Sequence, residues 1–137
     1  MRENVDRGGK YRLLRQTSRW ARFAQVTVHG AVATEPEVRM GDVFGWRGRS
    51  YGTAPCASRS DDQRIRAEAR EGAWYALMRL PEEARGVSVS VVEIVTAPAD
   101  TGPGDVKFAA ADAVWQAVGQ KPDQHPWIGE DGSPVFP

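Results

Sequence analysis

Hydrophobic and polar residues alternate with a period of two in residues 23–29. One side is small and apolar and the other is mixed. The two sides are Ala24, Val26 and Val28, and Phe23, Gln25, Thr27 and His29. This alternation predicts a half-buried strand. Residues 30–41 are interpreted as a connection, residues 42–46 as a second short strand, and residues 47–53, with two glycines, as a turn.

A helical period begins at residue 60. The run Ser60-Asp61-Asp62-Gln63 is a capping box, in which the serine hydroxyl accepts a backbone N–H and the glutamine reaches back. The two aspartates suit the positive end of the helix dipole. We predict a helix to about Leu80, because Pro81 cannot continue it. Its apolar face consists of Ile65, Ala69, Ala73, Ala76, Leu77 and Leu80.

The second half contains the most apolar stretches. Residues 87–95 predict a central strand, with the valines at 87, 89, 91 and 95 on one face and Glu93 interrupting it. After a loop over residues 96–104, residues 105–118 are apolar nearly all round and predict a buried helix that ends at Gly119. Residues 120–137 hold four of the nine prolines without periodicity, which predicts an extended tail.

Together these elements predict an α+β fold. It has one sheet of about four strands with two helices packed on one face. A chain of 137 residues fits a single domain, which we place at residues 1–119, followed by the Pro-rich tail at 120–137.

Composition narrows the class of protein. Hydrophobic residues make up 41% and charged residues 26%, as in ordinary globular proteins, and no apolar run reaches membrane-spanning length. The polar start is unlike a secretory signal, and the single cysteine, Cys56, has no internal partner for a disulfide. We therefore expect a cytoplasmic protein that does not bind a membrane.

Charge is distributed unevenly. Residues 1–60 hold 11 basic and 5 acidic side chains, whereas residues 61–137 hold 7 and 13, although the net charge is zero. Seven basic residues fall between Arg2 and Arg22. Such an arm attracts phosphates. An arginine-rich solvated surface explains the same pattern, so both interpretations stay open.

No catalytic constellation is recognisable. The chain lacks a P-loop, which excludes a GTPase, and lacks the Gly-x-Ser-x-Gly of hydrolases. Its two histidines, His29 and His125, are not spaced with Cys56 or acidic residues for a metal, and Cys56 is interpreted as an inert thiol. We predict no enzyme, no cofactor and no metal.

One helix carries a candidate partner surface. Trp74 lies about 180° from Ile65 at about 100° per residue, with Met78 close by, so both face away from the sheet. An exposed pair of this kind requires a cover. The neighbouring helix or the tail near Trp127 is one cover, and a protein partner or a second copy is the other.

Several motifs resemble one family, in the same order along the chain. They are Gly9 to Thr17, with its Arg15-Gln16-Thr17, and Ala97 to Phe108. Residues 72–119 align without a gap, whereas residues 31–59 match poorly. The residues that carry this alignment are Gly72, Leu77, Pro81, the strand at 87–95, Asp100, Phe108, Ala111 and Gly119. Over about 100 residues the chain is similar to domain IV of bacterial elongation factor G, a translation factor.

This resemblance implies the fold of the second domain of a small-subunit ribosomal protein, with a left-handed βαβ crossover against the usual rule. It also implies a tip that enters the ribosomal decoding site, built here by residues 18–22 and 97–104. Both loops depart from the family. Where the family has a glycine-rich turn, this chain has Ser18-Arg19-Trp20-Ala21-Arg22. Ala99 stands at the family's histidine position, and Pro103 and Gly104 stand where the family has serines before the helix. Losing these glycines argues against an identical tip conformation.

Two functional hypotheses follow. The first is a ribosome-binding or RNA-binding protein, in which Trp20 stacks on a base between arginines. Its candidate residues are Arg15, Arg19, Trp20, Arg22, Arg47, Arg49 and Asp100. The second is a protein-interaction module or dimer that uses Trp74 and Met78.

Overall fold

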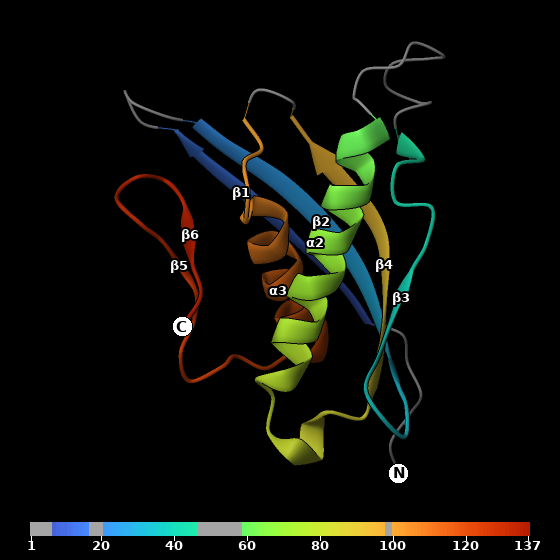
Figure 1. Cartoon of the computed structure of the whole chain (residues 1–137). Coiled ribbons are helices and arrows are strands. Elements are labelled where there is room, and N and C mark those ends of the chain that lie inside the picture. The colour runs from blue at the N-terminus through green and yellow to red at the C-terminus, as the bar shows by residue number, and fades with distance from the viewer. Residues whose placement is uncertain (1–6, 17–20, 47–58, 98–99) are drawn as a thin grey trace.

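The computed structural model describes residues 7–16, 21–46, 59–97 and 100–137. Its elements are β1 (Arg7–Gln16), β2 (Ala21–Val32), β3 (Glu37–Met40), α2 (Arg59–Met78), η1 (Glu82–Ala84), β4 (Val87–Thr96), α3 (Asp105–Val118), β5 (Trp127–Ile128) and β6 (Pro134–Val135). The fold is α+β, as predicted. A four-stranded sheet has the order β1-β2-β4-β3, with β3 parallel to β4 and the other pairs antiparallel. Helices α2 and α3 cover one face of it (Figure 1).

The region after β2 corrects two predictions. Residues 30–41 are not a simple connection, since β2 continues to Val32 and Glu37–Met40 forms β3 against β4. Residues 42–46 are not a strand. They lie along the open edge of β4, where the indole of Trp46 donates to the carbonyl of Ile94 at 2.6 Å. The carbonyl of Val43 accepts from the Ile94 amide at 2.9 Å.

Strand β4 contains a β-bulge at Val92. Thr27 pairs with Glu93, but the next residue, Val28, pairs with Val91, so Val92 is the extra residue. The inward-facing side therefore changes from Val89 and Val91 to Ile94 and Thr96, all four of them buried. The prediction that Val95 shares a face with the preceding valines is wrong for this reason. The bulge also explains why Glu93 is not directed into the core.

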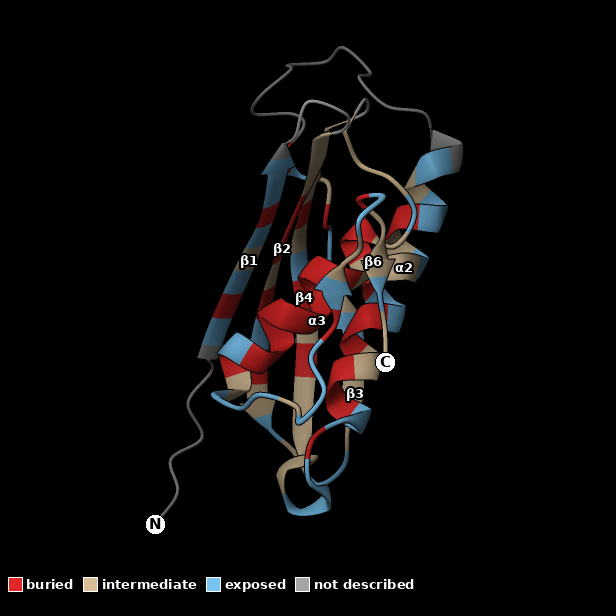
Figure 2. Ribbon diagram, turned by 90° about the vertical axis from the view of Figure 1, so that its left-hand side faces the viewer, coloured by how far each residue is buried: buried red, intermediate tan, exposed pale blue. Residues whose placement is uncertain are grey.

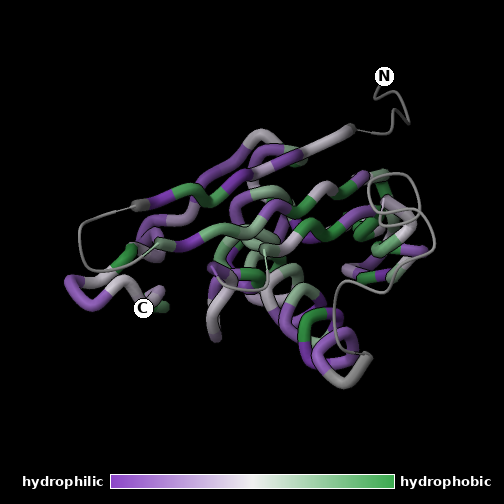
Figure 3. Tube along the Cα trace, turned by 90° about the horizontal axis from the view of Figure 1, so that it is seen from above, coloured by the Kyte–Doolittle hydropathy of each residue, from purple (hydrophilic) through white to green (hydrophobic). Residues whose placement is uncertain are grey.

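The predicted inner side of β2 is confirmed, because Ala24, Val26 and Val28 have no exposed surface. Figure 3 shows green and purple alternating along the strands, as expected when only one face is buried. Helix α3 lies in the centre of the molecule, as predicted from its apolar surface, with eleven of its fourteen residues buried (Figure 2).

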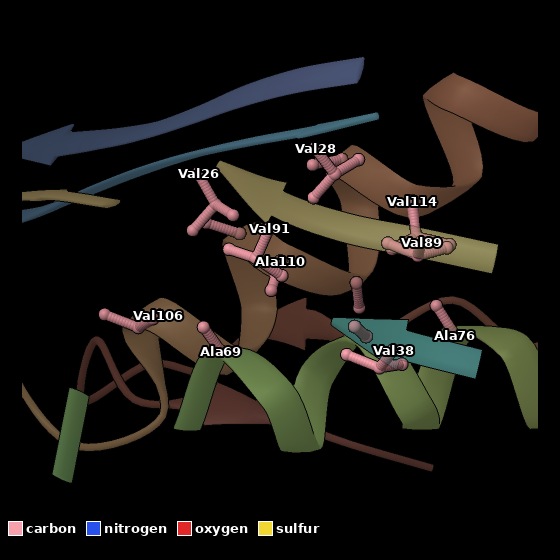
Figure 4. Close-up of a cluster of buried hydrophobic side chains, with 14 of the residues drawn as sticks. Val26, Val28, Val38, Ala69, Ala76, Val89, Val91, Val106, Ala110 and Val114 are labelled. Atoms are coloured by element: carbon pink, nitrogen blue, oxygen red, sulfur yellow. The ribbon is translucent and has the colours of Figure 1, made fainter. Parts of the chain in front are cut away.

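Small residues allow α3 to lie very close to its neighbours. A Cβ added at Gly72 of α2 would lie 2.3 Å from the carbonyl oxygen of Lys107, and one added at Gly9 of β1 would lie 2.1 Å from that of Ala113. Alanines from both helices pack against valines of the sheet (Figure 4). The backbone of α3 therefore lies in close contact with the backbones of α2 and β1, and this close approach shapes the core.

Helix ends follow the sequence in part. Gly119 ends α3 with φ of 72° and donates its N–H to the carbonyl of Trp115, as predicted. Helix α2 begins at Arg59 and ends at Met78, two residues before the predicted Leu80. The side chain of Ser60 is outside the described part, so the capping box stays a prediction.

The C-terminal segment is not an extended tail. Strands β5 and β6 form a small antiparallel hairpin beside α3 (Figure 1), and the carbonyl of Pro137 accepts hydrogen bonds from Tyr75 and Arg79. Within the described ranges, no helix combines the length and apolarity needed to cross a membrane.

Candidate nucleic-acid interface

Two segments far apart in the sequence meet at one end of the sheet. The amide of Phe23, near the start of β2, donates to the carbonyl of Asp100 at 2.9 Å. The hydroxyl of Thr101 donates to the carbonyl of Phe23 at 2.6 Å and accepts from the amide of Ala97 at 2.9 Å. These hydrogen bonds attach the loop before α3 to the start of β2, the strand that follows residues 17–20 in the sequence.

Two arginines lie opposite each other at this end. Arg15 of β1 pairs with Arg22 of β2, two residues beyond the buried pair Leu13 and Ala24, so the arginines point to the same face as that pair. Arg15 is exposed. The side chain of Arg22 is 21% exposed, and its guanidinium lies 3.8 Å from a carboxylate oxygen of Asp105.

Asp105 begins α3 and has no exposed surface. Burial raises the pKa of its carboxyl to about 6, against opposing effects of a hydrogen bond from Gly102 and the charge of Arg22. The Gly102 amide donates to Oδ2 at 2.7 Å, whereas Oδ1 has no hydrogen-bond partner. At neutral pH Asp105 is mainly ionised, so it offsets part of the positive charge of Arg22.

Glu68 occupies the N-terminus of α3. Its Oε1 accepts from the amides of Val106 at 3.0 Å and Lys107 at 3.2 Å. A helix N-terminus binds anions through such amides, and here a carboxylate of α2 already does so. The loop before α3 is therefore not a phosphate site of that kind. No local pattern distinguishes Glu68 from a solvated glutamate, so sequence reasoning missed it.

The other predicted residues are placed as follows. Arg19, Trp20, Arg47 and Arg49 lie outside the described residues. Asp100 contributes its backbone carbonyl, as given above.

The candidate partner surface is only partly exposed. Trp74 is half-buried and packs against the core, so it does not form an exposed pair with Met78, which is 43% exposed. The C-terminal segment contacts the adjacent side chains of Tyr75 and Arg79 rather than presenting Trp127, which is 52% exposed.

A second polar group lies about two turns further along α3 than Asp105, in a groove of about 750 Å³. His125 places Nε2 2.5 Å from Oδ1 of Asp112 and Nδ1 2.5 Å from the carbonyl of Pro126. Both ring nitrogens of His125 are therefore engaged by acceptors of the protein itself. Among the described residues there is no cluster of potential metal ligands.

Comparison with known proteins supports the fold class. A scan against models of protein families gives no match, and a search of curated proteins finds none that is significantly similar. Among 37 matching chains of solved structures is a protein from Thermus thermophilus, with a TM-score of 0.58 and 16% sequence identity. The match covers 95% of this chain but only 16% of that protein. At this identity the likeness establishes the fold alone.

Proposed function

We propose that this chain is a non-catalytic RNA-binding module of the elongation factor G domain IV type. It contacts RNA through the end of the sheet where Arg15 and Arg22 lie opposite each other. We expect this RNA to be part of the ribosome. The observation that carries the proposal is this arginine pair beside two joined segments. The ribosome is proposed as the partner because the sequence resembles domain IV of elongation factor G.

Arginine is the side chain that suits such a contact, because its planar guanidinium binds phosphate oxygens in pairs. Arg15 is exposed and available to a phosphate. The carboxylate of Asp105 lies beside the guanidinium of Arg22, which restrains the arginine side chain and offsets part of its positive charge. Since Glu68 fills the helix N-terminus, these arginines carry the phosphate contacts of the described part of this end.

The test is binding of a fluorescent RNA, and co-sedimentation with ribosomes, over a salt series. Wild-type affinity should fall steeply with salt, since each phosphate contact contributes about 0.7 to 0.9 to the log–log slope. The double change Arg15→Gln with Arg22→Gln should lower the slope by about 1.4 to 1.8. Arg39→Gln is the matched control, because Arg39 is equally cationic but lies on β3, where its side chain is 68% exposed beside Glu37.

Absence of RNA binding even at low salt refutes the proposal. Equal losses in the double variant and in Arg39→Gln would show that the contact is diffuse and not at this end. Association through the helix surface is the alternative, for which the exposure of Met78 is the supporting observation. A dimer in sedimentation velocity that Met78→Glu dissociates would favour it.

A further inference from the structure

The segment of residues 121–137, which we call the strap, is held across α3 by contacts at both ends. At its far end the ring of Phe136 lies edge-on to Tyr75 at 5.3 Å and to Phe108 at 6.5 Å. The carbonyl of Pro137 accepts from the hydroxyl of Tyr75 at 2.9 Å and from Arg79 at 2.6 Å.

At its near end the strap is joined to α3 by one histidine. The ring of His125 packs against Trp115 and Phe108, with centroids 5.3 and 6.1 Å apart. Both of its nitrogens face acceptors, the carboxylate of Asp112 and the carbonyl of Pro126. One of these bonds crosses from the strap to the helix, whereas the other fixes the turn of the strap at a buried proline.

The two hydrogen bonds of the His125 ring depend on one dissociable proton. Two hydrogen bonds from a ring to two acceptors require a hydrogen on each side of it. Either the imidazolium donates both, or Nδ1–H donates to the carbonyl while a protonated Asp112 donates to Nε2. When that proton is lost, a neutral ring facing a carboxylate has one hydrogen for two acceptors, whichever tautomer forms. One nitrogen lone pair then faces an oxygen, and one hydrogen bond is lost.

The ionisable groups around the ring come from three elements. They are Asp112 on α3, Tyr11 on β1 and Lys121 on the strap. Asp112 is 8% exposed, and burial raises the pKa of its carboxyl while His125 and Lys121 lower it. Burial also raises the pKa of Tyr11, which therefore stays neutral in the range where histidine changes charge. Among these groups, the His125–Asp112 pair is the one joined by a hydrogen bond that needs the dissociable proton.

We propose that the strap is a cover latched by this shared proton, closed when the His125–Asp112 pair is protonated and loosened when the pH rises. Loosening uncovers the aromatic rings of Phe108 and Trp115. It also moves Pro134 away from Gly104, the residue before Asp105, where a Cβ would lie 3.3 Å from the proline ring. The latch follows from the hydrogen-bond geometry and does not rest on RNA binding.

The test is amide hydrogen exchange of the intact chain between about pH 5.5 and pH 8.5, corrected for the intrinsic exchange rate at each pH. The opening constant of strap amides should rise by about tenfold or more with pH, relative to amides in the centre of α2, because a charge-assisted hydrogen bond is lost. This series uses the wild-type chain, so its outcome does not depend on whether a variant folds.

Variants assign the effect to the latch. His125→Gln should give a strap that is more open at low pH and whose opening no longer varies with pH, and Asp112→Asn should weaken the same dependence. His29→Gln is the control, because His29 is exposed on β2, whose neighbours in the sheet are β1 and β4. A wild-type opening constant that does not change with pH overturns the proposal. So does a pH dependence that persists in His125→Gln or disappears in His29→Gln.

Discussion

Replacing Asp105 by Asn should alter how stability depends on pH. The carboxyl has a pKa of about 6 in the folded protein and an ordinary value of 3.8, so the folded state binds its proton more tightly than the unfolded state does. Wild-type stability therefore contains a favourable contribution below about pH 4 that is lost as the pH rises to about 6. The full difference corresponds to about 3 kcal/mol, at about 1.4 kcal/mol per factor of ten in proton affinity. Asparagine cannot ionise, and its carbonyl still accepts from Gly102.

The assay is urea unfolding of both proteins from about pH 4 to about pH 7.5, where most of the effect falls. Over this range the stability of Asp105→Asn relative to wild type should increase by about 2 to 3 kcal/mol. Asp123→Asn, a change at an exposed carboxylate, is the control and should give no such trend. Parallel curves for Asp105→Asn and wild type would refute the reasoning that burial without a partner at Oδ1 disfavours the charge. The same variant should bind RNA more tightly at neutral pH, because a negative charge beside Arg22 is removed.

Other changes test the close packing and the cap of α3. Gly9→Ala should destabilise the protein by at least about 2 kcal/mol in urea unfolding, because its Cβ meets a backbone carbonyl, whereas Gly8→Ala should be tolerated, since nothing lies within 4 Å. Gly72→Ala should also destabilise it, by about 1 to 3 kcal/mol, although alanine ordinarily favours a helix by about 1 kcal/mol; a more stable variant in thermal unfolding would contradict the close approach to Lys107. Glu68→Ala should cost about 1 kcal/mol and increase hydrogen exchange in the first turn of α3, and unchanged exchange there would contradict the cap.

Periodicity identified the elements whose burial is regular along the chain. The inner side of β2 and the buried helix α3 follow directly from it, because every turn or residue pair repeats the same environment. It failed at β3, which has only four residues, and at the bulge at Val92, where the pattern shifts by one. Both are fixed by pairing with a strand fifty or more residues away, which a local pattern does not contain.

The candidate interface was predicted from a family resemblance together with the basic residues between Arg2 and Arg22. Arg15 and Arg22 were candidates because they border a loop that the family uses, and their opposition across two strands required the sheet register. Glu68 and the His125–Asp112 pair could not be foreseen, since each joins residues that only the packing brings together. The C-terminal strap, with neither periodicity nor a long element, was misjudged for the same reason.

The indole of Trp46 has a consequence for solubility. Strand β3 pairs with β4 only as far as Val91, so the second half of β4 would present an unpaired edge of the kind that recruits strands from other molecules. The segment from Val43 to Trp46 occupies that edge with a backbone and an indole hydrogen bond to Ile94. Loss of the indole would then favour aggregation of a still-folded sheet, before any loss of helix.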